Sequence, residues 1–374
     1  MSAVEVQFPN PPAGQPQWLT LAINTFNTMV PRWDMEKCNG GLRWQVFEKN
    51  AGWDYKNSIS NGAFFQLAAR LARYTGDANY VTWAEKIWNW CENVGLISKD
   101  YAVYDGTDRN NNCSDVNHLE WSYNNAIFIY GAAALANMTQ SKVWIDRTNG
   151  LLAASSRFFS PFPNSTNIMF EAACETVSTC NVDQFSFKAY LARWLAKTAI
   201  IAPWTKDTIY ALLEPSAIAA TSSCVQSGTE VSCGSHWYTG GFDGISGLGQ
   251  QLSALEVVSS LLAFKGGEPV TAAGVKVPCF QQSGDASVAN RNCAVAAGNS
   301  AGPADDSAAD AGPQPTTLVT STVPAATLAP PTQKAPQPQS PPATGNTQSS
   351  TMPPELQRIL DVIVQWMASL ARNK

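Results

Sequence analysis

The chain of 374 residues has little charge. Charged side chains make up 14%, and 24 Lys and Arg stand against 29 Asp and Glu, a formal net charge of −5. Because no basic excess is available to neutralise phosphates, the composition argues against a nucleic-acid-binding protein. No run of 18 or more apolar residues occurs, which argues against a transmembrane helix. Neither of the two histidines, His118 and His236, has the spacing of a zinc ligand, so we expect no metal and no cofactor.

Tryptophan and proline are plentiful, but in different parts of the chain. Twelve of the 13 Trp fall in residues 1–266, whereas twelve of the 23 Pro fall between Pro303 and Pro354. A segment with many prolines and few aromatic residues buries too little apolar surface to offset its ordering entropy. We therefore predict a folded domain over 1–266, a disordered Pro/Ala/Ser/Thr-rich segment over 267–352, and a short segment of helical, amphipathic pattern over 353–374.

Apolar residues in the predicted domain recur with helical spacing. This spacing predicts eight helices, at 18–29, 64–75, 80–90, 119–136, 143–159, 185–201, 205–220 and 248–264. Gly76 is the predicted C-terminal cap between the second and third, which then form an αα-hairpin. Successive helical hairpins without a convincing pair of strands predict an all-α domain, which is a bundle, a solenoid or an α/α toroid.

The linkers between these helices are rich in Asn, Asp, Gly and Trp, at 40–44, 54–62, 104–118 and 234–244. They show no fixed repeat, which disfavours a solenoid. Indole faces stack on the apolar faces of sugar rings, while Asn, Asp and Arg bind the hydroxyl groups. Such loops favour a toroid with a sugar-binding cleft. Trp44 and Trp237 lie beside Gly-rich loops and are the candidates for stacking, whereas most other tryptophans are expected in the core.

The nine cysteines indicate disulfides rather than a metal site. The predicted pairs are Cys38–Cys113, Cys174–Cys180 and Cys224–Cys233. Cys91 lies on an aromatic helix face and is expected to be free and buried, while Cys279 and Cys293 are candidates for a pair in the tail.

Three glycosylation sequons begin at Asn112, Asn137 and Asn164, and they agree with a secretory route. Residues 1–9 have neither the basic start nor the apolar segment of a signal peptide. The cysteines and sequons therefore favour secretion, whereas residues 1–9 do not resemble a signal peptide.

Several ordered blocks of residues 1–266 resemble glycoside hydrolase family 76, the endo-1,6-α-mannosidases, in its fungal cell-wall branch. The blocks are GLRWQ at 41–45, YKNSISNG at 55–62, VYDGTD at 103–108, EWSYN at 120–124, DG at 243–244 and GQQLSALE at 249–256. The resemblance implies a partial (α/α)6 toroid with about eight of its twelve helices. It also implies a retaining mechanism on α-1,6-mannan, or on mannosyl glycans of GPI-anchored proteins, in the secretory pathway to the cell wall or plasma membrane.

Carried over residue by residue, the resemblance implies substrate-binding roles for a set of cleft residues. They are Arg43, Trp44, Asn57, Asn61, Asp105, Trp121, Asn124, Trp237 and Asp243. In the family an Asp-Asp pair precedes a stretch similar to Met1–Ala3, so we expect the catalytic pair upstream of Met1 and no catalytic residue within the chain. Asp105 and Asp108 are not expected to replace it. The alternatives are a non-catalytic mannan-binding relic and an interaction protein that acts through the Pro-rich tail.

Overall fold

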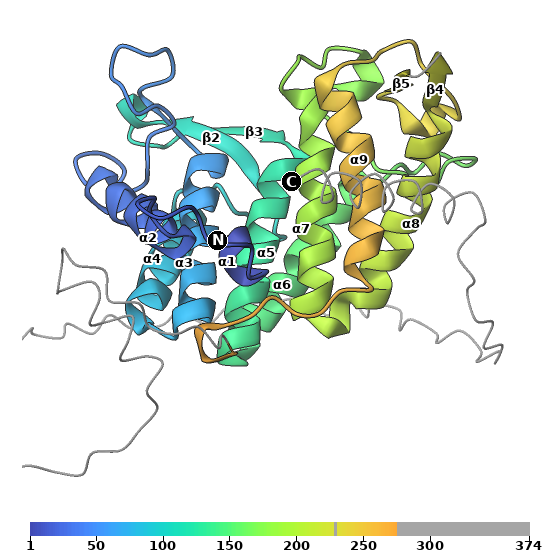
Figure 1. Cartoon of the computed structure of the whole chain (residues 1–374). Coiled ribbons are helices and arrows are strands. Elements are labelled where there is room, and N and C mark those ends of the chain that lie inside the picture. The colour runs from blue at the N-terminus through green and yellow to red at the C-terminus, as the bar shows by residue number, and fades with distance from the viewer. Residues whose placement is uncertain (228–229, 275–374) are drawn as a thin grey trace, which may run out of the picture.

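The computed structural model describes residues 1–227 and 230–274 (Figure 1). The predicted disordered segment beyond 274, the terminal helical segment and the Cys279–Cys293 pair lie outside the described residues. Within them the helices are α1 (Ser2–Glu5), α2 (Trp18–Met29), α3 (Ser58–Thr75), α4 (Ala78–Asn93), α5 (Ser122–Thr139), α6 (Lys142–Ala154), α7 (Phe187–Ile201), α8 (Lys206–Ser222) and α9 (Leu248–Ala263).

The helices form two layers. In the inner layer α3, α5, α7 and α9 pack side by side in that order, and α4, α6 and α8 cover them from outside (Figure 1). Small residues on α5 allow close approach, since a Cβ on Gly131 would lie 2.5 Å from the Phe65 ring. The outer helices meet through large rings instead, and Trp88 of α4 lies 5.6 Å from Trp144 of α6, centroid to centroid.

Helix ends follow the chemistry of the local sequence. Asn57 accepts a hydrogen bond from the Ser60 amide and so caps α3, and Asp77 caps α4 through the Asn79 amide. Gly76 ends α3 with a φ of 76°, a left-handed conformation that glycine adopts without steric cost. The prediction of a C-terminal cap at Gly76 is confirmed.

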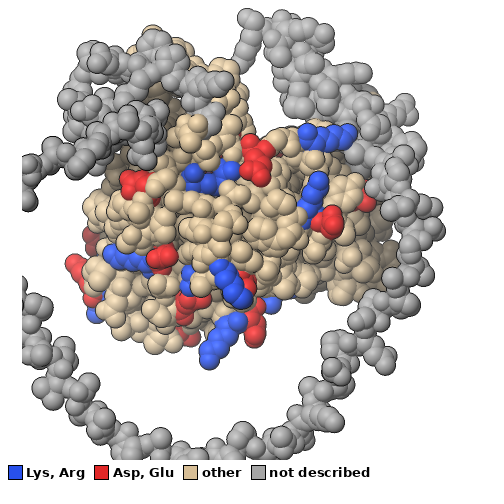
Figure 2. Space-filling model, turned by 90° about the horizontal axis from the view of Figure 1, so that it is seen from below, with Lys and Arg blue, Asp and Glu red and all other residues tan. Residues whose placement is uncertain are grey.

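The connections alternate between long and short. The short turns lead from α3 to α4, from α5 to α6 and from α7 to α8, whereas the long loops 30–57, 94–121, 155–186 and 223–247 precede the inner helices. Because each inner helix begins after a long loop, these loops gather at one face, the upper face in Figure 1. The view from below shows acidic and basic side chains interspersed on the opposite face (Figure 2).

Two small antiparallel sheets lie within the long loops, so the prediction of no strand pair is wrong. One sheet has the order β1 (Tyr55–Asn57), β2 (Tyr104–Asp108), β3 (Val116–Glu120), and the other pairs β4 (Cys224–Ser227) with β5 (Glu230–Cys233). Strands of three to five residues are too short for a clear alternating pattern, and β1 pairs with a segment about fifty residues further along the chain. The predicted helix at 119–136 begins too early for the same reason, because Leu119 and Glu120 belong to β3.

Three disulfides hold these loops. The predicted pairs Cys38–Cys113, Cys174–Cys180 and Cys224–Cys233 are all formed. Cys91 is free and buried as predicted, and burial raises the pKa of its thiol. In the described ranges, no helix is long and apolar enough to cross a bilayer.

Candidate functional site

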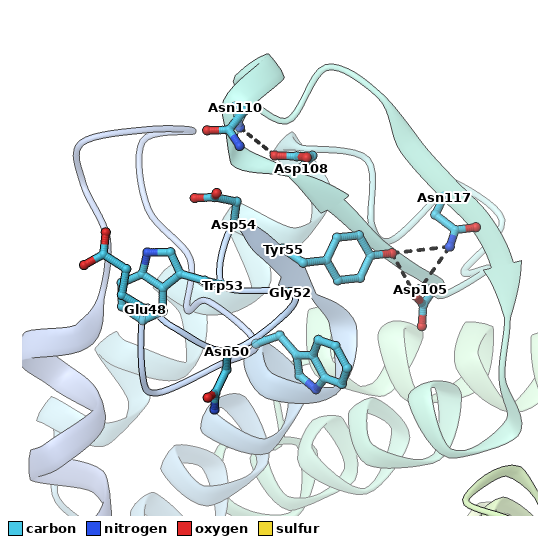
Figure 3. Close-up of a pocket in the computed structure, with 11 residues that line it drawn as sticks. Glu48, Asn50, Gly52, Trp53, Asp54, Tyr55, Asp105, Asp108, Asn110 and Asn117 are labelled. Atoms are coloured by element: carbon cyan, nitrogen blue, oxygen red, sulfur yellow. Dashed lines mark hydrogen bonds between the residues drawn. The ribbon is translucent and has the colours of Figure 1, made fainter.

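A cavity of about 710 Å³ opens among the long loops, between the segment 44–55 and strand β2 (Figure 3). Its wall combines indole and phenol rings with carboxylates and amides. The lining residues are Trp44, Glu48, Asn50, Gly52, Trp53, Asp54, Tyr55, Asp105, Asp108, Asn110 and Asn117.

One buried carboxylate holds the two sides of this cavity together. Oδ2 of Asp34 lies 3.1 Å from Nε of Arg43, 3.2 Å from Nζ of Lys56 and 3.2 Å from Nε of Arg109. Burial alone would raise the pKa of the Asp34 carboxyl, but the charges of Lys56 and Arg43 hold it below its ordinary value. The guanidinium of Arg43 also lies 4.3 Å above the Trp53 ring. Arg43 therefore supports the cavity wall from behind and does not line the cavity.

Asp105 is the carboxylate at the inner end of the cavity. The Tyr55 hydroxyl donates to its Oδ2 at 2.7 Å, and Nδ2 of Asn117 lies 3.3 Å from the Tyr55 oxygen (Figure 3). The Tyr55 ring covers Gly106, where a Cβ would lie 2.6 Å from it, so this position requires glycine. Burial raises the pKa of Asp105, and the hydrogen bond from Tyr55 only partly opposes this rise.

The N-terminus of α5 lies beside Asp105 and carries two further predicted residues, Trp121 and Asn124. The Asn124 amide is buried and makes no hydrogen bond of standard geometry within the described residues. A buried carboxylate fixes this terminus, because Glu171 accepts from both the amide and the hydroxyl of Ser122. Burial raises the pKa of Glu171 to about 8.

Of the predicted cleft residues, Trp44 and Asp105 line the cavity. The Trp44 side chain is half exposed, and its backbone amide donates to the Tyr55 carbonyl at 2.7 Å. Trp121 and Asn124 flank Asp105. Their roles in ligand binding stay predictions.

Asn57 and Asn61 stabilise the fold, contrary to the prediction that they contact substrate. Both are buried. Asn57 caps α3, and the Asn61 amide bonds the backbone N–H of Leu42 at 2.8 Å and its carbonyl at 3.1 Å. The block 55–62 therefore makes the start of a helix.

Trp237 and Asp243 are also structural. Trp237 is fully buried, with its indole N–H donating to the Gly234 carbonyl and the Lys188 ammonium 4.0 Å from its ring, so the prediction of sugar stacking there is wrong. The Asp243 carboxylate accepts from the His236 amide and the Ile245 amide, which uses its oxygens inside the loop 234–245.

In the folded chain, both polar atoms of the Asn137 side chain, the first residue of a predicted sequon, are hydrogen-bonded. Its Nδ2, the atom that would carry a glycan, donates to the Ile201 carbonyl at 2.8 Å, and its Oδ1 accepts from Arg73 at 2.8 Å. Asn112 and Asn164 are exposed. A glycan at Asn137 stays a prediction, and it would have to replace the bond to the Ile201 carbonyl.

The sequence gives little sign of three residues that build the site: Tyr55, Asn117 and Glu171. Tyr55 and Asn117 reach Asp105 only through strand pairing, and Glu171 reaches Ser122 across 49 residues. The block 55–62 contains Tyr55 and supplied the only signal for this group. In the part of the chain that is described, no three His, Cys, Asp or Glu side chains are grouped to hold a metal ion.

An arc of paired inner and outer helices, with an open aromatic and acidic cavity in the loops before the inner helices, defines the class of α/α-toroid glycosidases. The chain belongs to glycosyl hydrolase family 76, whose sequence profile matches residues 1–273. Solved members of the family are (α/α)6 toroids, so the eight longer helices described here form part of such a ring, as predicted.

Named relatives agree with this assignment. The chain is 48% identical over 276 residues to mannan endo-1,6-alpha-mannosidase DCW1 of Eremothecium gossypii, with 73% of this chain and 60% of that protein covered. It is 47% identical over 267 residues to mannan endo-1,6-alpha-mannosidase DFG5 of Candida albicans, with 70% of this chain and 58% of that protein covered. The chain thus spans about 60% of the length of these relatives.

Solved structures agree as well. Dfg5 from Chaetomium thermophilum, crystallised with glucosamine, superposes with a TM-score of 0.68 at 44% identity, over 72% of this chain and 67% of that one. The GH76A alpha-1,6-mannanase from Salegentibacter shares the fold with a TM-score of 0.52 at 19% identity, over 65% of this chain and 68% of that one.

Proposed function

We propose that this chain belongs to a mannan endo-1,6-alpha-mannosidase, a glycosidase or transglycosidase that acts on α-1,6-mannan in fungal cell-wall biogenesis. The observation that carries the proposal is the cavity in which Asp105, Tyr55 and Asn117 form one hydrogen-bonded group near the half-exposed Trp44. Relatives 47–48% identical to the chain are mannan endo-1,6-alpha-mannosidases, which supports the substrate class.

In this proposal the cavity binds a mannose unit by two kinds of contact. The Trp44 ring stacks on the apolar face of the pyranose, as indoles do in sugar sites. Asp105 and Asn117 bind the hydroxyl groups, with Tyr55 fixing the orientation of the carboxyl. Asp105 is a binding residue here, since a retaining glycosidase needs two carboxyl groups about 5 Å apart, and the family places that pair on another helix.

The mannosyl glycans of GPI-anchored proteins, and a place at the cell wall or plasma membrane, are the finer part of the proposal. Three disulfides support passage through an oxidising compartment. The choice between hydrolysis and transfer depends on what intercepts the glycosyl intermediate, water or a sugar hydroxyl.

The test measures binding and turnover of α-1,6-mannotriose by the wild type and by the variants Trp44→Ala and Asp105→Asn. We expect each variant to weaken binding roughly tenfold, because each loses about 1–2 kcal/mol of contact. Phe47→Ala is the matched control for Trp44, since this exposed ring lies on the same loop outside the cavity. Binding without turnover would favour the non-catalytic alternative, and no binding at all would refute the proposal.

A further inference from the structure

A second groove, of about 640 Å³, lies between α4 and the two loops that the Cys38–Cys113 disulfide joins, and it shares no lining residue with the cavity around Asp105. We name it the α4 groove. Lys86, Asn89 and Asn93 face it from one side of α4, at spacings of three and four residues.

Four asparagines line the α4 groove, and two of them have amides without a hydrogen bond in the described part of the chain. The exposed side chains of Asn39 and Asn93 make no hydrogen bond within the described residues, so each offers a donor and an acceptor. Trp33 and Trp90 also line the groove, and the buried Nε1 of Trp33 has no partner there. Free amides suit a sugar that carries an acetamido group, because the N–H and the carbonyl of that group each find a partner.

One edge of the groove is a sequon, Asn112-Cys113-Ser114. The Asn112 side chain is oriented by the Cys38 amide, which donates to its Oδ1 at 2.9 Å. Its Nδ2 makes no hydrogen bond within the described residues, and the residue is exposed. The atom that a glycan would occupy is therefore free, in contrast to Nδ2 of Asn137.

We propose that Asn112 carries an N-linked glycan whose first N-acetylglucosamine lies in the α4 groove. The donor is a polyprenyl-diphosphate-linked oligosaccharide. A bond forms between Nδ2 and the anomeric carbon, the bond from that carbon to the diphosphate oxygen breaks, and the amide loses one proton. Oδ1 is unchanged, so the contact with Cys38 persists. Because the sugar is tethered beside the groove, weak contacts suffice for occupancy. The inference is independent of the proposed function.

The first experiment secretes the chain from a host that adds N-glycans and measures occupancy of each sequon by glycopeptide mass spectrometry. The release of the Asn112 glycan by peptide N-glycosidase F is then timed on the native and the denatured protein. In the native wild type, we expect release to be slower than in Asn93→Ala by roughly tenfold, the protection that one or two hydrogen bonds to the Asn93 amide would give. Asn79→Ala, at the far end of α4, should release at the wild-type rate. Asn93 and Asn79 are both exposed, so both variants should fold.

A second measurement tests the proposal without peptide N-glycosidase F. Ser114→Ala removes the sequon and leaves the Asn112 contact with Cys38, whereas Ser114→Thr retains the sequon. Ser114→Ala also loses the hydrogen bond from the Ser114 hydroxyl to the Asn111 carbonyl, with or without a glycan. We therefore expect the melting temperature of Ser114→Ala to lie below that of Ser114→Thr by roughly 3 °C more when both are secreted than when both are made without glycosylation. An unmodified Asn112, or equal release rates from the wild type and Asn93→Ala, would overturn the proposal. A third outcome would also overturn the proposal: unglycosylated protein binds free chitobiose, but the glycan on Asn112 is not protected. The groove would then be a site for a free ligand.

Discussion

Replacing Glu171 by glutamine should remove a pH dependence from the stability of the domain. The carboxyl is fully buried and bonded to Ser122 at the start of α5, and burial raises its pKa from 4.5 to about 8. The native state therefore keeps this proton up to about pH 8, while the unfolded chain loses it near pH 4.5. Between these values unfolding releases a proton, so the free energy of unfolding falls as the pH rises.

The magnitude follows from the size of the shift. One pH unit changes the free energy of unfolding by about 1.4 kcal/mol, so the interval between the two pKa values amounts to roughly 5 kcal/mol. Glutamine has nearly the same shape, and its carbonyl oxygen still accepts from the Ser122 amide, but it does not titrate. Its amide nitrogen faces the Ser122 hydroxyl, which then has to accept rather than donate, and this rearrangement costs about 1 kcal/mol at every pH.

Urea unfolding followed by circular dichroism, from about pH 5 to about pH 8, measures the effect. The stability of Glu171→Gln relative to the wild type should rise by about 4 kcal/mol across this range. Glu85→Gln is the control, because Glu85 is exposed on α4, and its curve should run parallel to that of the wild type. A parallel curve for Glu171→Gln as well would refute the reasoning, since it would show that Glu171 ionises alike in both states.

Three further changes test the parts that hold the site. Replacing Cys38 and Cys113 together by serine removes a covalent link between residues 75 positions apart. This change should lower the free energy of unfolding by about 4 kcal/mol, and an unchanged urea midpoint would contradict it. Asn61→Ala leaves two buried backbone groups unpaired and should cost about 2–3 kcal/mol in urea unfolding, with mannotriose affinity of the folded protein unchanged. Lost affinity at full stability would instead restore Asn61 to the cleft. Asp34→Asn removes the negative charge that three cations share and should cost about 3–5 kcal/mol, and an unaltered melting temperature would show that those charges are independent.

The helices could be predicted from the sequence because their signals are local. Apolar spacing located all eight, and Gly76 marked an end, since a helix is built from contacts three and four residues apart. The sheet β1–β2–β3 could not be predicted in this way. Each strand is short, and what stabilises it is a partner distant in the chain.

The candidate site was predicted in part. Trp44 and Trp237 look alike in the sequence, since both lie beside Gly-rich loops, yet one lines the cavity and the other is buried over Lys188. Only the path of the loop decides which indole faces water. The prediction that Asn57 and Asn61 bind substrate failed for another reason. An amide that caps a helix and an amide that binds a sugar use the same atoms, so the sequence does not distinguish them.

The three disulfides described here all lie in the long loops, and none of them joins one helix to another. The covalent links described therefore act on the loop face of the domain, while the helices are held to one another by packing, hydrogen bonds and ion pairs such as Arg193–Glu256. Thiol reductants should therefore separate the fold of the domain from its affinity for ligand, two properties that are usually lost together. The helical signal would persist while recognition by the loops faded, so the redox state of the surroundings would set the affinity of the protein without changing its fold.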